Sequence, residues 1–337
     1  MPMSGQVLVF DIETVADTAA FRLVNKIPAN TPEEEVLAAM NAERLSEVGN
    51  TFHRHHMHRV VCISLLLADI YQGKIKLWTL GRNHSEAEIL QRFFAGIDKF
   101  LPSLVSWNGT GFDLPVLHYR ALLHGIRAQN YFANGEDSHT IGKVSGFRYN
   151  NYLSRYHWRH LDLMDILSGY SARAQASLND IAKLCGFPGK LETDGSKVQD
   201  LFVSGDIKAI CDYCETDVLN TYGVYLRFEL MRGNLDDNLY RANLDLLSGY
   251  LQKLSQDSDK KHIQEFITAW QNYSVKKYAL YSNEPQKMPE KEQNLGGEAQ
   301  NKLKEAENKQ ENPTSLENQE VAIEMNRNNE DNLIGEN

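Results

Sequence analysis

The stretch VLVFDIETVAD (residues 7–17) begins as a hydrophobic run and then carries two acids, Asp11 and Glu13. Successive side chains of a β-strand point to opposite faces, so the two acids would share one face while Phe10 and Ile12 take the other. Two carboxylates held together repel each other, and they ionise readily only if a cation lies between them. Asp11 and Glu13 would then be ligands of a metal ion. The alternative is that the strand ends here and the two acids are solvated or cap a helix, and so short a motif does not decide between these interpretations.

Length and composition indicate a globular chain with an atypical end. The 337 residues are 42% hydrophobic, which is enough for a substantial core in one large domain or two. From about Ser282 onward Asn, Gln, Glu and Lys dominate, and aromatic residues almost vanish. Such a composition cannot bury enough surface to become ordered, so we expect residues 283–337 to form a disordered tail.

Most of the formal net charge of −10 lies in this tail, which has 13 acids and 6 bases and so leaves −3 for residues 1–282. A near-neutral folded part argues neither for nor against a polyanionic partner, because a basic groove can lie beside an acidic metal site. No signal peptide precedes residue 7, and no apolar run reaches the ~18 residues of a membrane span. We therefore expect a cytoplasmic protein without membrane contact, whose protein partners the sequence does not identify.

Two patterns that look like metal sites are expected to be incidental. Cys211 and Cys214 form a C-x-x-C, but no second pair completes a four-ligand zinc set, and the pair lies within a predicted helix. The run HRHHMHR (residues 53–59) holds four histidines before a predicted strand, on what we expect to be a solvated loop. Magnesium prefers oxygen ligands, so we assign neither pattern a metal.

Strand and helix patterns alternate after the first strand. RVVCISLLLAD (59–69) and GKIKLWTL (73–80) predict a hairpin, and Ser85 with Glu88 forms a capping box that begins a helix over 85–100. Further strands are predicted at 103–109 and 160–167, and further helices at 113–125, 177–186 and 206–231. This order predicts an α/β domain with a mixed sheet.

Three more side chains fall where they can join Asp11 and Glu13. Asp113 begins a predicted helix just after a strand, where capping that helix is the simpler role. Tyr213 and Asp217 are four residues apart on the long helix and so share a face. Acids on helices are usually solvated. The strand with Asp11 and Glu13, the helix that begins at Asp113 and the helix with Asp217 nevertheless belong to one α/β domain. We therefore predict that the four carboxylates converge, as they would in a site for two cations.

Three motifs in this order resemble those of the DEDD 3′ to 5′ exonucleases: FDIET (10–14), NGTGFDLPVL (108–117) and YCETD (213–217). The tyrosine four residues before the last Asp is similar to the Tyr-containing branch, since Asp212 stands where the other branch has histidine. The chain most resembles standalone bacterial proteins related to the proofreading exonuclease domain of family B DNA polymerases. The resemblance implies an RNase H-like fold, with a mixed five-stranded sheet in the order 3-2-1-4-5 flanked by helices.

The resemblance covers residues 5–233, which we expect to form the exonuclease domain. Residues 235–281 are predicted to be a helical extension packed on that domain, followed by the tail at 283–337. No polymerase domain is expected, because too few residues remain after the third motif.

The implied chemistry is phosphodiester hydrolysis with two Mg²⁺ or Mn²⁺ ions about 3.5 to 4 Å apart. By resemblance, Asp11 would bridge the ions. Glu13 and Asp217 would complete the site that activates water, and Asp113 would hold the second ion through a water molecule. Tyr213 would orient the attacking water, since its ordinary pKa of about 10 makes it a poor base at neutral pH.

The predicted substrate contacts are less localised. FRYNNYLSRYHWRH (147–160) interleaves arginines with aromatic residues, as a single-strand site would, although an ordinary exposed loop can have the same composition. Within it we select four contacts: Arg148, Tyr152, Arg155 and Trp158. The resemblance adds Thr14, Asn108 and Phe112 near the terminal nucleotide, for which core packing or a strand-end turn is the alternative.

We therefore expect a 3′ to 5′ exonuclease that acts on single-stranded or frayed DNA, with RNA as the second choice. The alternative is a catalytically silent nucleic-acid-binding or scaffolding module on the same fold. A degenerate homologue would be expected to have lost at least one acid, whereas this chain has all four and the tyrosine.

Overall fold

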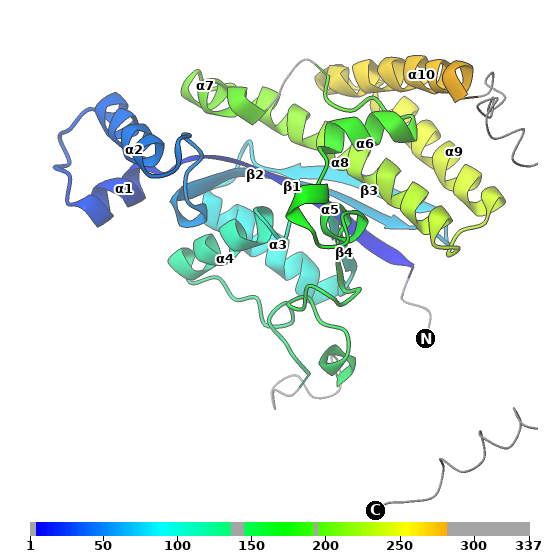
Figure 1. Cartoon of the computed structure of the whole chain (residues 1–337), viewed down its shortest axis with the longest axis horizontal. Helices are drawn as coiled ribbons and strands as arrows, with labels where there is room; N and C mark the ends of the chain where they lie inside the picture. The colour runs from blue at the N-terminus through cyan, green and yellow to red at the C-terminus, as the bar shows by residue number, and fades with distance from the viewer. Residues whose placement is uncertain (1–4, 136–144, 192–194, 282–337) are drawn as a thin grey trace, which may run out of the picture. The chain divides into compact units, whose positions relative to one another are not determined.

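A five-stranded mixed sheet runs through the molecule, in a computed structural model that describes residues 5–135, 145–191 and 195–281 (Figure 1). Its strands are β1 (Gln6–Ala16), β2 (His58–Asp69), β3 (Lys74–Leu80), β4 (Ser103–Ser106) and β5 (His160–Asp162). They lie in the order β3-β2-β1-β4-β5, with β1 antiparallel to β2 and parallel to β4. The strand order expected for the RNase H-like fold is thereby confirmed.

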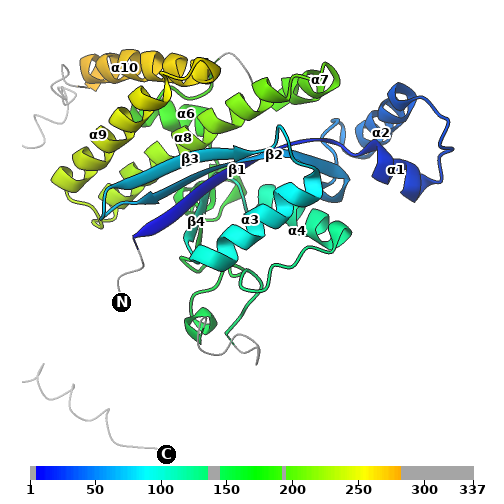
Figure 2. The same cartoon turned by 180° about the vertical axis from the view of Figure 1, so that it is seen from behind.

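Helices cover both faces of this sheet (Figure 1, Figure 2). On one face lie α3 (Glu86–Phe100) and α4 (Asp113–His124), and on the other lie α8 (Ile207–Met231), α6 (Leu178–Cys185) and α9 (Asp237–Leu254). The remaining helices are α1 (Thr18–Asn25), α2 (Glu33–Val48), α5 (Leu163–Leu167), α7 (Val198–Val203) and α10 (Lys261–Tyr281). Among the described residues, no helix combines the length and the apolar character needed to span a bilayer.

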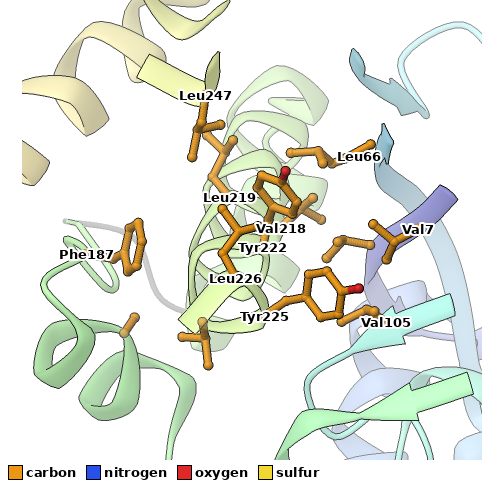
Figure 3. Packing of buried hydrophobic residues seen from close by; sticks show 14 of the residues in the cluster. Val7, Leu66, Val105, Phe187, Val218, Leu219, Tyr222, Tyr225, Leu226 and Leu247 are labelled. Carbon is orange, nitrogen blue, oxygen red and sulfur yellow. The ribbon is translucent and has the colours of Figure 1, made fainter. Parts of the chain in front are cut away.

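The alternation of side chains along β1 produces these two layers. Its odd-numbered apolar residues, from Val7 to Val15, belong to buried clusters that include α8, and Figure 3 shows part of this packing. Its even-numbered residues, from Leu8 to Ile12, belong to a second cluster formed with α3 and α4. The two acids of β1 have odd numbers, so the strand period of two directs them toward α8.

Helices α9 and α10 occupy the stretch 235–281, which was predicted to be helical. Leu247 of α9 and Phe266 of α10 are fully buried in the same cluster as α8. The described residues up to Ala279 form one compact unit. The domain borders proposed at 233 and 281 stay a prediction, and the tail predicted at 283–337 lies outside the described residues.

Several parts of the predicted element pattern are wrong. The strand predicted over 103–109 ends at Ser106, and helix α7 was not predicted. The strand predicted over 160–167 ends at Asp162, because this carboxylate accepts hydrogen bonds from two backbone N–H groups of α5 and so begins a helix. The pattern also omitted α1 and α2. Helix α2 buries only Val36 and Met40, so its apolar periodicity is weak.

Candidate metal centre

The end of β1 carries the first two carboxylates toward α8. Asp11 is paired with Ser64 and Glu13 with Cys62 across the antiparallel ladder to β2. The register shifts between Glu13 and Thr14, and such a bulge bends a strand and re-aims its side chains. Glu13 is buried and Asp11 is half-buried. Both acids therefore leave the same face of the sheet at the point where its regular pairing ends.

A tight loop between β4 and α4 leads to the third carboxylate. Asn108 has a left-handed backbone with φ 64°, and a Cβ on Gly109 would lie 2.1 Å from Ser106 Oγ, so only glycine fits at position 109. The Asp162 carboxylate holds the loop by accepting hydrogen bonds from the backbone N–H groups of Asn108 at 2.9 Å and Thr110 at 2.8 Å. The neighbouring strand β5 thus fixes where α4 begins.

Asp113 is the first residue of α4 and is 4% exposed. The N-cap of that helix is Phe112, whose side chain makes no capping hydrogen bond, so Asp113 does not have the capping role of the alternative interpretation. The charge of Asp113 raises the pKa of both Asp11 and Glu13. The three carboxylates are therefore close enough to influence one another.

Helix α8 supplies the fourth carboxylate and the tyrosine. Its N-cap, Asp206, accepts a hydrogen bond from the first turn, and the helix is buried along most of its length. Tyr213 and Asp217 are each 7% exposed and lie one turn apart. The charges of Glu13 and Asp11 raise the pKa of Tyr213, so this face of α8 meets the acidic face of β1.

The four carboxylates of this site have little positive charge near them. Burial, and then the charges of neighbouring groups, raise the pKa of Asp11 and Glu13 well above their ordinary values. Burial raises the pKa of Asp113 to about 7 and that of Asp217 to about 6, although the charge of Lys190 and a hydrogen bond with Tyr213 work against the latter rise. Asp217 Oδ1 is buried without a hydrogen-bond partner. A bound cation would recover the free energy that such an oxygen costs.

The donor set fits a hard divalent cation. Mg²⁺ and Mn²⁺ prefer oxygen ligands in octahedral geometry, and Asp11, Glu13, Asp113 and Asp217 supply carboxylate oxygens. The ligand atoms of Asp11, Glu13 and Cys214 lie within 4.8 Å of one another. Divalent metal is the usual cofactor of exonucleases of the kind that the motifs resemble, and the site has the chemistry to hold it.

Tyr213 stays protonated in this site. Burial, followed by the charges of Asp217, Glu13 and Asp11, raises its pKa far above the ordinary value. Lys190 Nζ lies 5.5 Å from the centre of the tyrosine ring, within the range of a cation–π contact. The phenol is therefore a hydrogen-bond donor and a poor base at neutral pH.

Thr14 and Phe112 line a hollow of about 630 Å³ beside Glu13. His58 Nε2 lies 3.1 Å from the His53 carbonyl oxygen and must donate to it, because a carbonyl only accepts. His58 Nδ1 is then the acceptor for the Thr14 hydroxyl at 2.9 Å. Burial lowers the pKa of His58 to about 4, so the imidazole is neutral and keeps this arrangement at neutral pH.

The prediction of a solvated histidine run is wrong for His58. This residue is 7% exposed, and its ring lies edge-on to Phe112 with 5.0 Å between ring centres. Phe52 packs against both rings at 5.2 and 5.4 Å. Part of the run therefore builds the wall of the hollow rather than extending into solvent.

The substrate contact predicted for Tyr152 is also wrong. Its ring is 2% exposed and lies parallel to Tyr131 with 5.5 Å between centres, and its hydroxyl donates to the Pro102 carbonyl oxygen at 2.6 Å. Aromatic composition alone cannot distinguish a core ring from a stacking platform. Arg155 is paired with the Asp165 carboxylate through two hydrogen bonds of 2.7 Å, so its charge is already engaged within the protein.

The other predicted contacts remain at or near the surface. Trp158 is 39% exposed, with the Arg232 guanidinium carbon 4.1 Å from its ring centre. Arg148 is exposed beside Tyr149. Asn108 sits in the loop held by Asp162. Contact of these side chains with nucleic acid stays a prediction.

Three residues that shape the site were not predicted for it: Asp162, His58 and Lys190. Asp162 is the last residue of β5, so the pattern of an acid that ends a short apolar strand could have identified it. Lys190 lies in the loop after α6, and His58 lies at the start of β2. A single lysine in a loop has no periodic or motif signal.

The family described as a predicted 3′-5′ exonuclease related to the exonuclease domain of PolB matches residues 50–270, a range that includes Asp113, Tyr213 and Asp217. One similar solved structure is the family B DNA polymerase from the hyperthermophilic archaeon Pyrobaculum calidifontis, with a TM-score of 0.41 and 16% identity. That similarity covers 83% of this chain and 29% of the polymerase, so the chain spans under a third of the polymerase's length. No curated protein matches the chain.

Proposed function

The chain belongs to the family of predicted 3′ to 5′ exonucleases related to the exonuclease domain of PolB, and from this premise we propose that it shortens single-stranded or frayed DNA from the 3′ end by two-metal hydrolysis. RNA is the second substrate to test. We assign the Tyr-containing DEDD branch because Tyr213 lies four residues before Asp217. The cytoplasm is the proposed location.

One observation carries the proposal. Asp217 Oδ1 is buried without a partner, on a face where burial raises the pKa of all four acids and like charge raises it further for Asp11, Glu13 and Asp113. Buried carboxylates that only hold a fold are normally paired within the protein. Carboxylates that bind a cation lack such partners within the protein. Phosphodiester hydrolysis is a reaction that two bound cations promote.

Each side chain of the site has a role in this chemistry. Asp11, Glu13 and Asp217 would hold one ion, and Asp11 with Asp113 the second. When bound, the ions would lower the pKa of the attacking water and stabilise the leaving 3′ oxygen. Tyr213, protonated at neutral pH, donates a hydrogen bond that fixes the direction of the water.

Lys190 and the hollow beside Glu13 are the proposed substrate contacts. The Lys190 ammonium lies above the Tyr213 ring, where it adds positive charge near the phosphate that gains negative charge in the transition state. The hollow of about 630 Å³ is within the size range of small-molecule sites, and the rings of Phe52 and Phe112 line it. A terminal nucleotide fits this combination of room and aromatic surface.

The alternative function, a silent binding module, would need a site that had lost part of its chemistry. This chain has all four acids and Tyr213 on facing elements, so the enzyme is favoured. The module would be favoured instead if divalent cations affected neither hydrolysis nor stability.

The direct test is hydrolysis of 5′-labelled single-stranded DNA and of its RNA counterpart with Mg²⁺, Mn²⁺ or EDTA. We expect a ladder that shortens from the 3′ end, that requires the cation, and that Asp11→Ala abolishes. The matched control is Asp180→Asn, an exposed carboxylate on α6 whose loss should leave the ladder unchanged.

Two results would contradict the proposal. If Asp11→Ala still hydrolyses nucleic acid, the assignment of the metal site is wrong. Absence of hydrolysis of either nucleic acid, with binding retained, would establish the module instead.

A further inference from the structure

An apolar hollow of about 290 Å³ lies between β3, at the edge of the sheet, and α3, which covers that face of the sheet (Figure 2). Leu67 of β2 and Trp78 of β3 line it from the sheet, and Phe93 and Phe100 line it from the helix. Trp78 is half-buried, and Phe100 is 48% exposed. An exposed apolar surface within a polar rim is typical of a site that another molecule covers.

Gly96 keeps the helix side of this hollow open. It lies in the interior of α3, where glycine is less favourable than alanine, and its backbone is not left-handed. A Cβ on Gly96 would meet no atom within 4 Å, so neither packing nor backbone geometry requires glycine here. Because Gly96 lines the hollow, a larger side chain at this position would fill the space.

Three cations, Lys76, Arg92 and Lys99, form a cationic rim around the hollow. Arg92 lines the hollow directly. Lys76 Nζ lies 5.9 Å from the ring centre of Trp78, and Lys99 Nζ lies 5.0 Å from that of Phe100. Within the described residues, none of the three forms an ion pair. The rim therefore offers positive charge directly beside apolar rings.

The acids of α3 do not neutralise this rim. Glu86 is paired with Arg120, and Glu88 belongs to the capping box at the start of the helix. The Asp98 carboxylate accepts a hydrogen bond of 3.0 Å from a backbone N–H of the loop after α4. The chain as a whole is acidic, so the rim is a local excess of positive charge that an anionic partner would complement.

We propose that the hollow and its cationic rim bind an acidic peptide segment of a protein partner, with a leucine or phenylalanine side chain inserted in the hollow. Carboxylates that flank this anchor would pair with the rim. A nucleobase fits less well, because leucine and aromatic side chains dominate the lining and would leave the polar edges of a base without hydrogen bonds. An apolar side chain loses no hydrogen bond when it enters.

The hollow lies on the opposite face of the sheet from the carboxylates of the metal site. Leu8 of β1 lines the hollow, whereas Asp11 and Glu13 have odd numbers and leave the other face of the same strand. Peptide binding is thus independent of the proposed hydrolysis and of any metal.

Phage display of random peptides on the full-length chain in EDTA, with counter-selection on Gly96→Leu, supplies the probe. We expect the enriched peptides to combine leucine, phenylalanine or tryptophan with aspartate or glutamate. Fluorescence anisotropy of a labelled enriched peptide then gives its dissociation constant. This constant should rise about tenfold or more in Gly96→Leu, whose side chain fills the hollow. Lys76→Glu should raise it about fivefold or more and weaken its dependence on salt.

Two variants are matched controls. Gly96→Ala adds one methyl group to α3 and should keep most of the affinity. Lys253→Glu makes the same change of charge as Lys76→Glu, at an exposed position on α9, and should leave the affinity unchanged. A urea midpoint of Gly96→Leu at or above that of the wild type shows that any loss of binding is not a loss of folding.

Three results would overturn the proposal. The first is failure to enrich any peptide, or enrichment of peptides without acidic residues. The second is an affinity that either Gly96→Leu or Lys76→Glu leaves unchanged. The third is single-stranded DNA that displaces the peptide and itself binds more weakly to Gly96→Leu, which would assign this face to nucleic acid.

Discussion

Glu215 and Asp217 lie two residues apart on α8 and show two ways of burying a carboxylate. Glu215, 1% exposed, accepts hydrogen bonds from Thr79 at 2.8 Å, Lys260 at 2.6 Å and His262 at 2.8 Å. Burial would raise its pKa, but the hydrogen bonds and charges of His262 and Lys260 lower it overall. Asp217 faces the other carboxylates, and its pKa rises to about 6 with burial as the main cause.

The difference between Glu215 and Asp217 indicates which buried carboxylates need a cation that the chain itself does not supply. Glu215 joins α8 to Lys260, in the turn before α10, and to His262 of α10, and is compensated by these groups. Arg120 of α4 does the same for two other buried acids, Asp17 and Glu86. Asp217 has no such partner for Oδ1. Carboxylates that support the fold are paired, and the carboxylates left over are those that a cation would pair.

The largest effect should come from Asp217→Asn. Removal of one carboxylate from the metal site should lower the hydrolysis rate by about 10³-fold or more, because several kcal/mol of charge stabilisation is lost. Initial rates on 5′-labelled single-stranded DNA with Mn²⁺ measure this loss. The matched variant Glu215→Gln should keep the wild-type rate per folded molecule, and equal losses in the two variants would break the comparison.

The free energy of unfolding should be reduced more by Glu215→Gln than by Asp217→Asn, which is the reverse of their effects on the hydrolysis rate. Glu215→Gln leaves the charges of Lys260 and His262 without their anion and should reduce the free energy of unfolding by about 3 kcal/mol. Asp217→Asn in EDTA should cost nothing or stabilise the fold, because it relieves repulsion among unpaired carboxylates. Urea unfolding of both variants at neutral pH gives the two values. A larger loss in Asp217→Asn than in Glu215→Gln would contradict the account.

The pH dependence of stability in EDTA should separate the two acids further. The pKa of Asp217 in the folded state, about 6, is above its ordinary value of 3.8, so its contribution to stability is full below about pH 4 and is lost as pH rises through 6. Asp217→Asn should therefore gain on the order of 2 kcal/mol over the wild type between about pH 4 and pH 8.

The contribution of Glu215 to stability changes with pH in the opposite direction. Its folded pKa is below the ordinary value of 4.5, so its contribution is present above that pH and is lost as pH falls through the folded value. The deficit of Glu215→Gln should therefore shrink in acid. Urea unfolding from well below pH 4 up to pH 8 checks both trends, and parallel curves for the two variants would refute the distinction.

The smallest effect is expected at the exposed end of the same helix. Lys208 is 40% exposed and pairs with Asp212 one turn further along α8. Lys208 is the exposed member of this pair, and Asp212 keeps Arg82 and His262 as partners, so Lys208→Ala should change the free energy of unfolding by about 0.5 kcal/mol. A shift of the urea midpoint as large as that of Glu215→Gln would show that burial does not govern these pairs.

Periodicity predicted the parts of the fold that alternate strictly. The period of two along β1 placed Asp11 and Glu13 on one face, and the helical period placed Tyr213 with Asp217. Both depend only on local backbone geometry, which the sequence determines over a few residues. The strand order needed the family resemblance in addition.

What the sequence did not reveal depends on tertiary contacts. Tyr152 has the composition of a stacking residue, yet Tyr131 and Pro102 enclose it. His58 becomes neutral and buried only because Phe112 and Thr14 pack on it. Helix α2 is amphipathic only weakly, and the capping of α5 by Asp162 shortened a predicted strand.

Binding of Mn²⁺ followed by electron paramagnetic resonance tests the central claim most directly, because free Mn²⁺ gives a signal that bound Mn²⁺ loses. The account predicts about two ions bound per wild-type chain, as in two-metal nucleases. Glu215→Gln should bind as the wild type does, and Asp217→Asn should lose at least one ion. Equal binding by Asp217→Asn and the wild type, or no binding by the wild type, would show that the unpaired carboxylates are not a cation site.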